Sequence, residues 1–339
     1  MQPQVRQWFE RRTSDAADWP LDRLLAAKAA GGTSVAVVLP ARDEEATVGA
    51  IVRAIRTALV DAAPLVDELV VLDSGSTDRT AAEAAAAGAH VVARDAVLPR
   101  LPAVPGKGEV LWRSLLATSA DVIVFVDADL REFSPDVVTG LLGPLLCPPE
   151  PGCGGVEFVK AVYDRPLRAG ETVLPAGGGR VTELVARPVL NLHWPELAGF
   201  VQPLAGEYAA RRCLLERLPF PCGYGVELAL LVDTLALAGL DAMAQVDLGV
   251  RHHRHQDDAA LGRMAAEVWQ AALARLVPGR PRRAEDPTLT QFERAGGSFR
   301  IVAHDVTAVE RPPMLTVPEY TARSSKTGAH PHSARPRSA

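Results

Sequence analysis

The chain has 339 residues, of which 48% are hydrophobic and 23% charged, with a formal net charge of -5 and a pI of about 5.9. This is the composition of a globular protein long enough to bury a core, and its mild acidity argues against bulk nucleic-acid binding, which needs a basic surface. An anionic substrate must therefore be bound by local donors and not by the overall field of the protein.

Cysteine usage and hydropathy indicate a cytoplasmic protein without a membrane span. The N-terminal segment MQPQVRQWFERR lacks the apolar core of a signal peptide. The longest apolar stretch, 228–240, is broken by Asp233 and is too short to cross a bilayer. No C-x-x-C pair is present, and reduced thiols in a reducing compartment are expected. The four cysteines are Cys147, Cys153, Cys213 and Cys222.

Apolar runs alternate with helical stripes from residue 34 to residue 126. Residues 1–32 read as a polar lead-in with one short helix. An alanine-rich helix is predicted between Ser76, its expected N-cap, and Gly88. The other predicted elements are strands at 34–39, 68–72, 90–93 and 122–126 and helices at 44–62 and 107–118.

This alternation predicts an α/β fold with a Rossmann-type, mostly parallel sheet flanked by helices. In such sheets ligands bind beyond the carboxyl ends of the strands. Polar motifs follow three of the predicted strands, at 40–45, 73–78 and 127–129. We therefore expect the functional site at this edge of the sheet.

The second half of the chain is less regular. A Gly-rich turn at 177–179 is expected to open a helix near Val181, and a further helix is expected from Val226 to Leu240. Beyond about Pro281 the pattern thins, and residues 324–339 have the composition of a disordered tail.

Asp127-Ala128-Asp129 is the strongest chemical motif. It follows an apolar strand, and residues two apart in an extended chain point to the same side, so both carboxylates can converge on one hard cation such as Mg²⁺. Such a cation would hold a diphosphate and stabilise the charge of a departing nucleotide. Taken alone, a D-x-D sequence is also compatible with a solvated turn.

Two further motifs suit a nucleotide. Asp73 and Ser74, in D-S-G-S-T-D, either contact a nucleoside or form an ordinary capped turn. Lys107, in P-G-K-G-E, opens a helix without Walker spacing. A cation at a helix start is slightly unfavourable, which favours a bound anion there over a surface lysine.

The motifs of the second half suit an acceptor and a metal. Arg180 and Thr182, after three glycines, present donors for a phosphate or carboxylate, or belong to a flexible loop. Glu227 opens an apolar helix, where it either orients sugar hydroxyls or complements the helix dipole. One histidine of R-H-H-R-H at 251–255 either completes a metal shell or lies in a solvated turn.

Together these segments resemble the actinobacterial glucosyl-3-phosphoglycerate synthases, which are retaining glycosyltransferases with a GT-A-like fold. The resemblance extends from about Ser34 to Pro313. The matching segments are VVLPARDEEATV, ELVVLDSGSTD, PGKGEVLWRSL, VIVFVDADL, GGGRVTELVARP, QPLAGEYAA, GYGVE, AQVDLGVRHHRH and ERPPM.

The resemblance implies site residues. Glu227, Lys107 and Asp129 are implied as catalytic, and Asp129 and His253 as ligands of Mg²⁺ or Mn²⁺. The acceptor-binding residues are then Gly179, Arg180, Val181, Thr182 and His255. The donor-binding residues are Pro40, Ala41, Glu44, Asp73, Ser74, Lys107, Asp127, Ala128, Leu204, Tyr224 and Glu227.

The implied reaction transfers glucose from UDP-glucose to D-3-phosphoglycerate and releases UDP. Its product feeds glucosylglycerate and methylglucose lipopolysaccharide synthesis, and the family implies a homodimer. The chain would divide into a lead-in (1–32), a nucleotide-sugar half (33–150), an acceptor-binding and dimerisation half (151–318) and a disordered tail (319–339). Front-face attack, without a covalent protein nucleophile, is the expected route to retention.

The sequence departs from the family pattern at three positions and leaves three alternatives open. Asp43 stands for an expected asparagine, and His255 and Gln256 replace an Asn-Arg pair among the outer acceptor contacts. The alternatives are a GDP-glucose or GDP-mannose donor, a sugar-phosphate nucleotidyltransferase, and a binding module without activity. The segment 40–45 lacks the Gly-rich loop of nucleotidyltransferases, and the candidate charged residues are all present, which argues against the last two.

Overall fold

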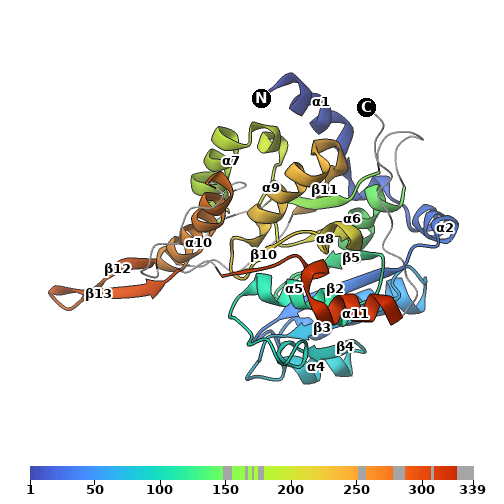
Figure 1. The fold of residues 1–339 in the computed structure, drawn as a ribbon, viewed down its shortest axis with the longest axis horizontal. Coiled ribbons are helices and arrows are strands. Elements are labelled where there is room, and N and C mark those ends of the chain that lie inside the picture. The colour runs from blue at the N-terminus through green and yellow to red at the C-terminus, as the bar shows by residue number, and fades with distance from the viewer. Residues whose placement is uncertain are drawn as a thin grey trace.

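An eight-stranded sheet runs through the centre of the protein (Figure 1). The computed structural model describes residues 1–147, 155–164, 167–169, 172–174, 179–250, 257–277, 287–306 and 309–326. The strand order is β1-β11-β6-β9-β5-β2-β3-β4, and every pair is parallel except those of β9 with β5 and β6. The strands are β1 (Thr13–Asp15), β2 (Val35–Ala41), β3 (Glu68–Asp73), β4 (His90–Ala93), β5 (Val122–Phe125), β6 (Phe158–Asp164), β9 (Tyr208–Arg211) and β11 (Met243–Val250).

Helices cover both faces of this sheet. The α-helices are α1 (Pro3–Arg12), α2 (Leu21–Gly31), α3 (Val48–Ile55), α4 (Thr80–Ala86), α5 (Lys107–Ala117), α6 (Asp136–Leu146), α7 (Arg187–His193), α8 (Arg212–Leu215), α9 (Val226–Ala238), α10 (Asp258–Leu276) and α11 (Pro318–Lys326). Helix α3 continues as a π-helical turn, Arg56–Asp61, and another, Thr182–Ala186, leads into α7. Short 3-10 turns span 16–18, 94–96, 195–199, 240–242 and 314–316.

The remaining strands form hairpins and a two-stranded ribbon. They are β7 (Leu167–Ala169) with β8 (Thr172–Leu174), β10 (Phe220–Pro221) with β14 (Glu310–Arg311), and β12 (Thr288–Ala295) with β13 (Ser298–Asp305).

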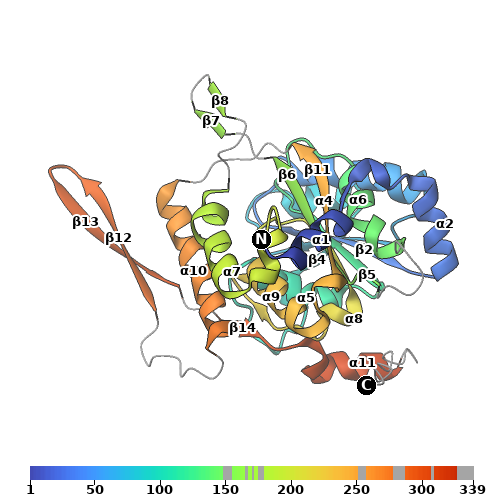
Figure 2. The ribbon, with the colours of Figure 1, turned by 90° about the horizontal axis from the view of Figure 1, so that it is seen from above.

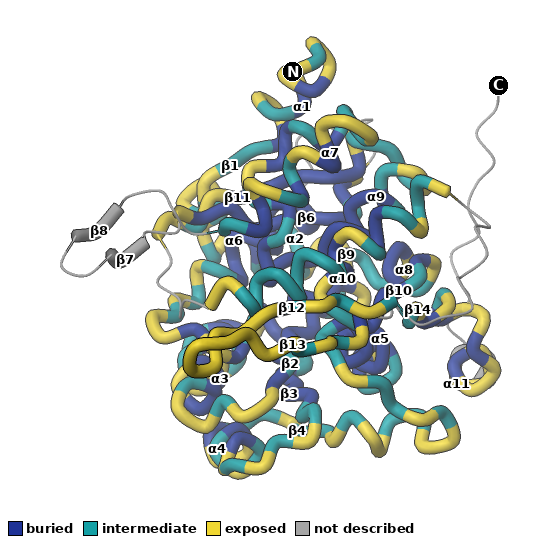
Figure 3. Tube along the Cα trace, turned by 90° about the vertical axis from the view of Figure 1, so that its left-hand side faces the viewer, coloured by how far each residue is buried: buried dark blue, intermediate teal, exposed yellow. Residues whose placement is uncertain are grey.

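The two faces of the sheet bury separate apolar clusters. In β5, Val122 and Val124 face a cluster built with α2, α3, α4 and α6, whereas Ile123 and Phe125 face one built with α1, α5, α9 and α10. This follows from the two-residue period of a strand. Figure 3 shows the buried strands behind a more exposed outer layer.

The predicted alternation between residues 34 and 126 is confirmed, with one error at α4. Ser76 does not cap this helix, which begins only at Thr80. Its hydroxyl donates instead to Asp73 Oδ1 at 2.5 Å and accepts from the Asp43 backbone at 2.9 Å. Asp78 takes the position near the helix start and accepts from the Thr80 backbone N–H at 2.9 Å.

The lead-in is more structured than predicted. It contains two helices and strand β1, which pairs in parallel with β11 at one edge of the sheet. Trp8 is 1% exposed and donates its indole N–H to the Met243 carbonyl at 2.9 Å. These contacts join residues more than 230 positions apart, so local periodicity carries no sign of them.

The C-terminal region also differs from the prediction. The β12–β13 hairpin projects from the body as an arm (Figures 1 and 2). The tail expected from residue 319 begins with helix α11, because Val317 and Tyr320 pack into the second apolar cluster. The remainder, 327–339, lies outside the described residues. Within the described part of the chain, no helix is both long enough and apolar enough to cross a bilayer.

Candidate active site

The carboxyl ends of β2, β3 and β5 bring the predicted donor residues to one edge. Ala41, at the end of β2, is in register with Asp73, at the end of β3. The Ser74 N–H donates to the Ala41 carbonyl at 2.8 Å, and Arg94 donates to the Ser74 hydroxyl at 3.0 Å. Pro40 is half-buried and Ala41 is buried. The predicted edge is therefore confirmed as a place where these motifs meet.

The loops after β2 and β3 hold each other in place. Asp43 adopts a left-handed backbone with φ 56°, and its carboxylate accepts from the Thr77 N–H at 2.8 Å. Asparagine and aspartate are the side chains that best tolerate this conformation, so Asp43 suits the position where asparagine was expected. The Glu44 N–H donates to the Thr80 hydroxyl at 2.7 Å, which places the Glu44 side chain beside the D-x-D motif.

Asp127 and Asp129 follow the end of β5, where Asp127 is half-buried and residues 128–129 form a turn. Ala128 is 3% exposed, its carbonyl accepts from the Thr47 hydroxyl at 2.6 Å, and Asp129 is exposed. Burial, together with the charges of Asp129, Asp78 and Asp127, raises the pKa of Glu44 to about 7. Several carboxylates therefore lie near enough to Glu44 for their charges to act on it.

This donor set fits a hard divalent cation, because carboxylate oxygens are its preferred ligands and because a cation would relieve the repulsion felt by Glu44. Among the residues that the structure describes, no group of three or more His, Cys, Asp or Glu side chains is arranged to hold a metal ion. The predicted ligand His253 lies outside the described residues, as does the predicted acceptor residue His255.

Lys107 joins two predicted site residues that lie far apart in the sequence. Its ammonium nitrogen is 2.5 Å from Asp127 Oδ1 and 3.1 Å from Glu227 Oε1. Burial disfavours the ammonium form, but the charges of Asp127 and Glu227 outweigh burial and hold the pKa of Lys107 well above its usual range. The lysine is therefore a fixed positive charge between two carboxylates.

Close backbone packing positions this lysine at the start of α5. A Cβ on Gly108 would lie 1.8 Å from the Pro221 carbonyl oxygen, and Gly106 has φ 124°. Only glycine permits this approach. The first turn of α5 therefore lies directly against the segment that leads into α9, which carries Glu227.

Gly206 packs directly against the ion pair between Lys107 and Asp127. This glycine is not among the site residues predicted from the sequence. A Cβ there would lie 2.0 Å from Asp127 Oδ2 and 2.7 Å from Lys107 Nζ. Glu207 and Tyr208 follow, at 1% and 0% exposure. All three belong to the segment QPLAGEYAA, whose match to the family pattern was the available signal.

The loop before α9 is anchored by a residue that sequence reasoning also missed. Glu267, on α10, accepts from the Tyr224 N–H at 2.7 Å. The Tyr224 side chain remains exposed, Leu204 is half-buried and Glu227 is 6% exposed. This loop therefore presents an accessible aromatic ring close to the buried Glu227 carboxylate.

A second group of buried charges lies behind the first turn of α5. Glu109, which is 0% exposed, binds Arg113 at 2.7 Å and Arg311 at 2.6 Å. Arg311 also donates to the Pro102 carbonyl at 2.7 Å. We call these three side chains the α5 triad; it ties the start of the helix to β14.

The predicted acceptor residues divide into accessible and buried groups. Gly179 and Arg180 are half-buried, and the Arg180 guanidinium forms an ion pair with Asp258 at the start of α10. Val181 and Thr182 are 6% and 3% exposed, and Val181 packs in the second apolar cluster. Arg180 is therefore the charged member of this set, and its side chain is partly exposed.

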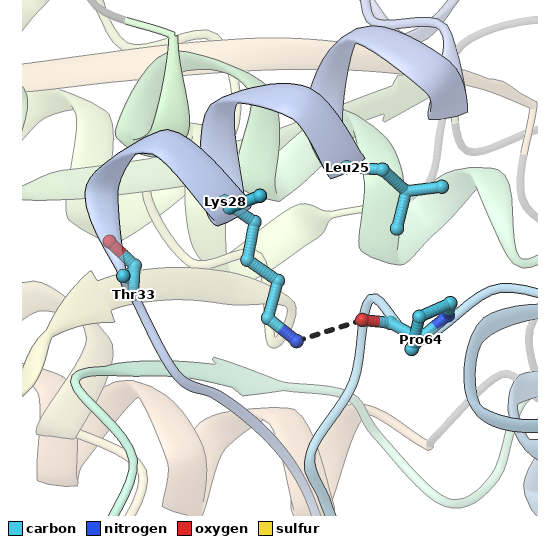
Figure 4. Close-up of a pocket in the computed structure, with 6 residues that line it drawn as sticks. Leu25, Lys28, Thr33 and Pro64 are labelled. Carbon is cyan, nitrogen blue, oxygen red and sulfur yellow. Dashed lines mark hydrogen bonds between the residues drawn. The ribbon is translucent and has the colours of Figure 1, made fainter.

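A cavity of about 410 Å³ lies away from this edge (Figure 4). It is lined by α2 and by Thr33 and Pro64, which precede β2 and β3. Lys28 donates to the Pro64 carbonyl at 2.8 Å across it. Because it sits at the amino ends of the strands, this cavity is separate from the carboxylate edge.

The fold and the site together define a glycosyltransferase. The family model described as Glycosyl transferase family 2 matches residues 36–150. Glucosyl-3-phosphoglycerate synthase of Mycolicibacterium smegmatis is 49% identical over 310 residues, covering 91% of this chain and 98% of that protein. The chain belongs to the glucosyl-3-phosphoglycerate synthase family.

Solved structures agree with this assignment. One is glucosyl-3-phosphoglycerate synthase from Mycobacterium tuberculosis in complex with Mn²⁺, UDP-glucose and phosphoglyceric acid, with 47% identity, a TM-score of 0.76, and coverage of 88% of this chain and 95% of that one. Another is mannosyl-3-phosphoglycerate synthase from Rubrobacter xylanophilus, with 40% identity, a TM-score of 0.82, and coverage of 91% and 97%.

Proposed function

We propose that this protein transfers glucose from UDP-glucose to D-3-phosphoglycerate with retention of configuration and releases UDP. The observation that carries the proposal is Lys107, held between Asp127 and Glu227 at the edge where Asp129 and Glu44 also gather. This arrangement provides one cation for a diphosphate and carboxylates for a metal and a sugar. The M. tuberculosis relative, solved with UDP-glucose and phosphoglyceric acid, supports the choice of substrates.

The donor is proposed to lie along the ends of β2, β3 and β5. Lys107 is a buried point charge suited to a phosphate oxygen. Glu227, close behind it, is suited to accept hydrogen bonds from glucose hydroxyls. The remaining proposed donor contacts are Pro40, Ala41, Glu44, Asp73, Ser74, Asp127, Ala128, Leu204 and Tyr224.

Asp129 and His253 are proposed to hold Mg²⁺ or Mn²⁺. When bound, the ion would neutralise charge on the departing nucleotide diphosphate. The convergence of Asp127, Asp129 and Glu44 supports a cation at this edge.

The acceptor is proposed to bind across Arg180, whose guanidinium matches a phosphate or carboxylate. The proposed partners of Arg180 are Gly179, Val181 and Thr182, near the start of the helical segment, and His255. The ion pair with Asp258 supports the assignment of Arg180, because it shows that an anion can reach this guanidinium.

We further propose front-face attack without a covalent protein intermediate, with the leaving diphosphate helping to accept the acceptor proton. Glu227 is already engaged by Lys107, which suits it to hold the sugar and not to attack it. Isolation of a competent glucosylated Glu227 or Asp129 would contradict this route.

The test of the proposed function is UDP release from UDP-glucose with 3-phosphoglycerate and Mg²⁺. We expect turnover only when both substrates are present, and the highest kcat/KM among UDP-glucose, GDP-glucose and GDP-mannose for UDP-glucose. The likeness to a mannosyl-3-phosphoglycerate synthase makes GDP-mannose the informative competitor. A higher kcat/KM with GDP-mannose, or pyrophosphate release from a nucleoside triphosphate, would overturn the proposal.

A cytoplasmic location and a homodimer complete the proposal. Cys147, Cys213 and Cys222 are free thiols, which suits a reducing compartment. The hairpin arm exposes Phe292, Phe299 and Ile301 at 66%, 60% and 69%, which suits contact with a second copy. Light scattering of the wild type and of a variant with serine at these three positions tests this: we expect a dimer and a monomer, and a monomeric wild type would contradict it.

A further inference from the structure

Lys160, in the middle of β6, is a buried lysine that the proposed reaction does not yet use. It interrupts the apolar strand Phe158–Asp164, its side chain is 0% exposed, and its ammonium nitrogen has no hydrogen-bond partner within the described structure. Buried lysines are rare unless paired, and an unsatisfied buried donor costs stability. Packing alone therefore does not account for a lysine at this position, which indicates a functional role.

The sheet places Lys160 beside the proposed donor site. Lys160 is in register with Tyr208 on β9, and Tyr208 is in register with Phe125 at the end of β5. The Lys160 ammonium lies 4.7 Å from the centre of the Tyr208 ring. The Tyr208 hydroxyl is also buried without a hydrogen-bond partner in the described structure. Two residues with unsatisfied polar groups thus lie on neighbouring strands, close to the end of β5 that leads to Asp127.

Opposite charges surround this lysine. Burial lowers the pKa of Lys160 to about 7, while the charges of Glu227, Glu207 and Asp127 act in the opposite direction and that of Lys107 adds to the lowering. These groups are therefore close enough for their charges to act on one another. Together they comprise three carboxylates and two lysines, which we call the site cluster.

Binding of the donor changes the balance within the site cluster. Lys107 is the lysine that contacts both Asp127 and Glu227. If a diphosphate binds Lys107, as the proposed function requires, its charge is shared with the phosphate. Glu227 then depends on the other lysine for neutralisation, since an unpaired buried carboxylate is costly.

We propose that Lys160 is a positioning residue, whose positive charge keeps the Glu227 carboxylate oriented toward the sugar while Lys107 holds the diphosphate. This inference rests on the proposed function. Lys160 itself is too buried to contact the substrate, so it acts through Glu227.

The test compares wild type with Lys160→Met, which removes the charge at similar volume. We expect kcat/KM for UDP-glucose to fall about 10- to 100-fold, the range for residues that orient a binding group from behind. The affinity for UDP, which lacks the glucose, should stay unchanged. A purely structural lysine would weaken UDP and UDP-glucose alike, and that result would overturn the proposal.

A double-mutant cycle with Glu227→Gln identifies the residue through which Lys160 acts. We expect Lys160→Met to have little further effect in the Glu227→Gln background, because the carboxylate it serves is gone. Additive losses would overturn the proposal. Lys160→Gln is the second variant, and loss of the fold in both variants, shown by circular dichroism, would also overturn it in favour of a structural role.

Lys28→Met is the matched control. Lys28 is also largely covered and pairs with Asp67 at 2.8 Å, but it lies at the opposite end of the strands. Its loss should leave kcat/KM unchanged. A wild type that releases no UDP would overturn the proposed function and this inference together, whereas an active wild type with additive losses would overturn only the role of Lys160.

Discussion

The α5 triad and the site cluster are two groups of buried charges at the start of the same helix, and they differ in how their charges are satisfied. In the triad, Glu109 is bound by both Arg113 and Arg311, and the arginines also donate to backbone carbonyls. In the site cluster, Lys107 serves two carboxylates and Lys160 has no hydrogen-bond partner in the described structure.

This difference separates a structural group from a functional one. Fully satisfied buried charges hold a unique local geometry, here the position of the first turn of α5. Incompletely satisfied charges cost stability and are characteristic of sites that a ligand completes. We therefore interpret the α5 triad as the structural group that positions Lys107. We interpret the site cluster as the group whose charges are completed when substrate binds.

The largest expected effect comes from Glu109→Gln. This change leaves two buried arginines short of a carboxylate, and breaking a buried pair typically costs about 3–5 kcal/mol of unfolding free energy. Chemical denaturation should show this loss, while kcat of the remaining folded protein stays near wild type. A full loss of activity without loss of stability would contradict the structural role and assign the α5 triad to the active site.

Asp129→Ala should act mainly on activity, in contrast to Glu109→Gln, which acts mainly on stability. Removing a proposed metal ligand should lower kcat/KM by at least about 100- to 1,000-fold, the range for losing one group that stabilises transition-state charge. The change also removes one repelling charge from beside Glu44. Asp22→Ala, in the first turn of α2, is the control and should leave activity unchanged.

Gly206→Ala tests the geometry of the site cluster without removing a charge. The new Cβ would lie 2.0 Å from Asp127 Oδ2, so the ion pair with Lys107 must shift. We expect kcat/KM to fall about 100-fold, the cost of a misplacement of roughly 1 Å at a reacting centre. In the control variant Gly155→Ala the new Cβ meets no atom within 4 Å, so kcat/KM should not change. Equal activity of the two variants would contradict the idea that the Asp127–Lys107 geometry requires glycine at position 206.

Arg180→Ala should produce a smaller effect, confined to the acceptor. Losing a charge-assisted contact worth about 1.5–3 kcal/mol should raise KM for 3-phosphoglycerate roughly 10- to 100-fold and leave UDP affinity unchanged. Asp258→Asn should lower that KM, because it removes a carboxylate that competes with the acceptor for this guanidinium. A loss of UDP affinity in Arg180→Ala would place this residue on the donor side.

The smallest expected effect is the pH dependence caused by Glu44. Its pKa is raised to about 7 in the folded, metal-free protein, so between its ordinary value of 4.5 and about 7 the folded state binds more protons than the unfolded state. Stability from this group therefore falls as pH rises through that window. Glu44→Gln should flatten the fall in a pH series of unfolding free energies, and an equal slope in both proteins would contradict the shift.

The half of the fold that the sequence predicted well is the one built from local patterns. β2, β3, β4 and β5 are short apolar runs separated by helical stripes, and each lies within a few residues of its predicted range. β1 and β9 have only three and four residues, and distant partners define them. No residue of the β12–β13 arm is fully buried, so the arm lacks the apolar core face that marks a strand in the sequence.

The site follows the same division. Asp127, Lys107 and Glu227 were predicted as site residues from strand ends, helix starts and family resemblance, but not the contact of Lys107 with both carboxylates. Gly206 and Lys160 were missed because their roles depend on side chains from other elements. A lysine inside the apolar run FVKAVY was the one local signal for Lys160. The assignments of His253 and His255 stay predictions.

The central position of β9 has a consequence for synthesis on the ribosome. β2 to β5 are translated before β9 and can assemble as a sheet, but the free side of β5 is covered only when residues 208–211 emerge. Until then the nascent chain exposes the edge of a wholly apolar strand, VIVF, which is a template for unwanted pairing. Slow translation between residues 126 and 208 would prolong this exposure, and a chaperone that binds extended apolar segments would be most useful in that interval.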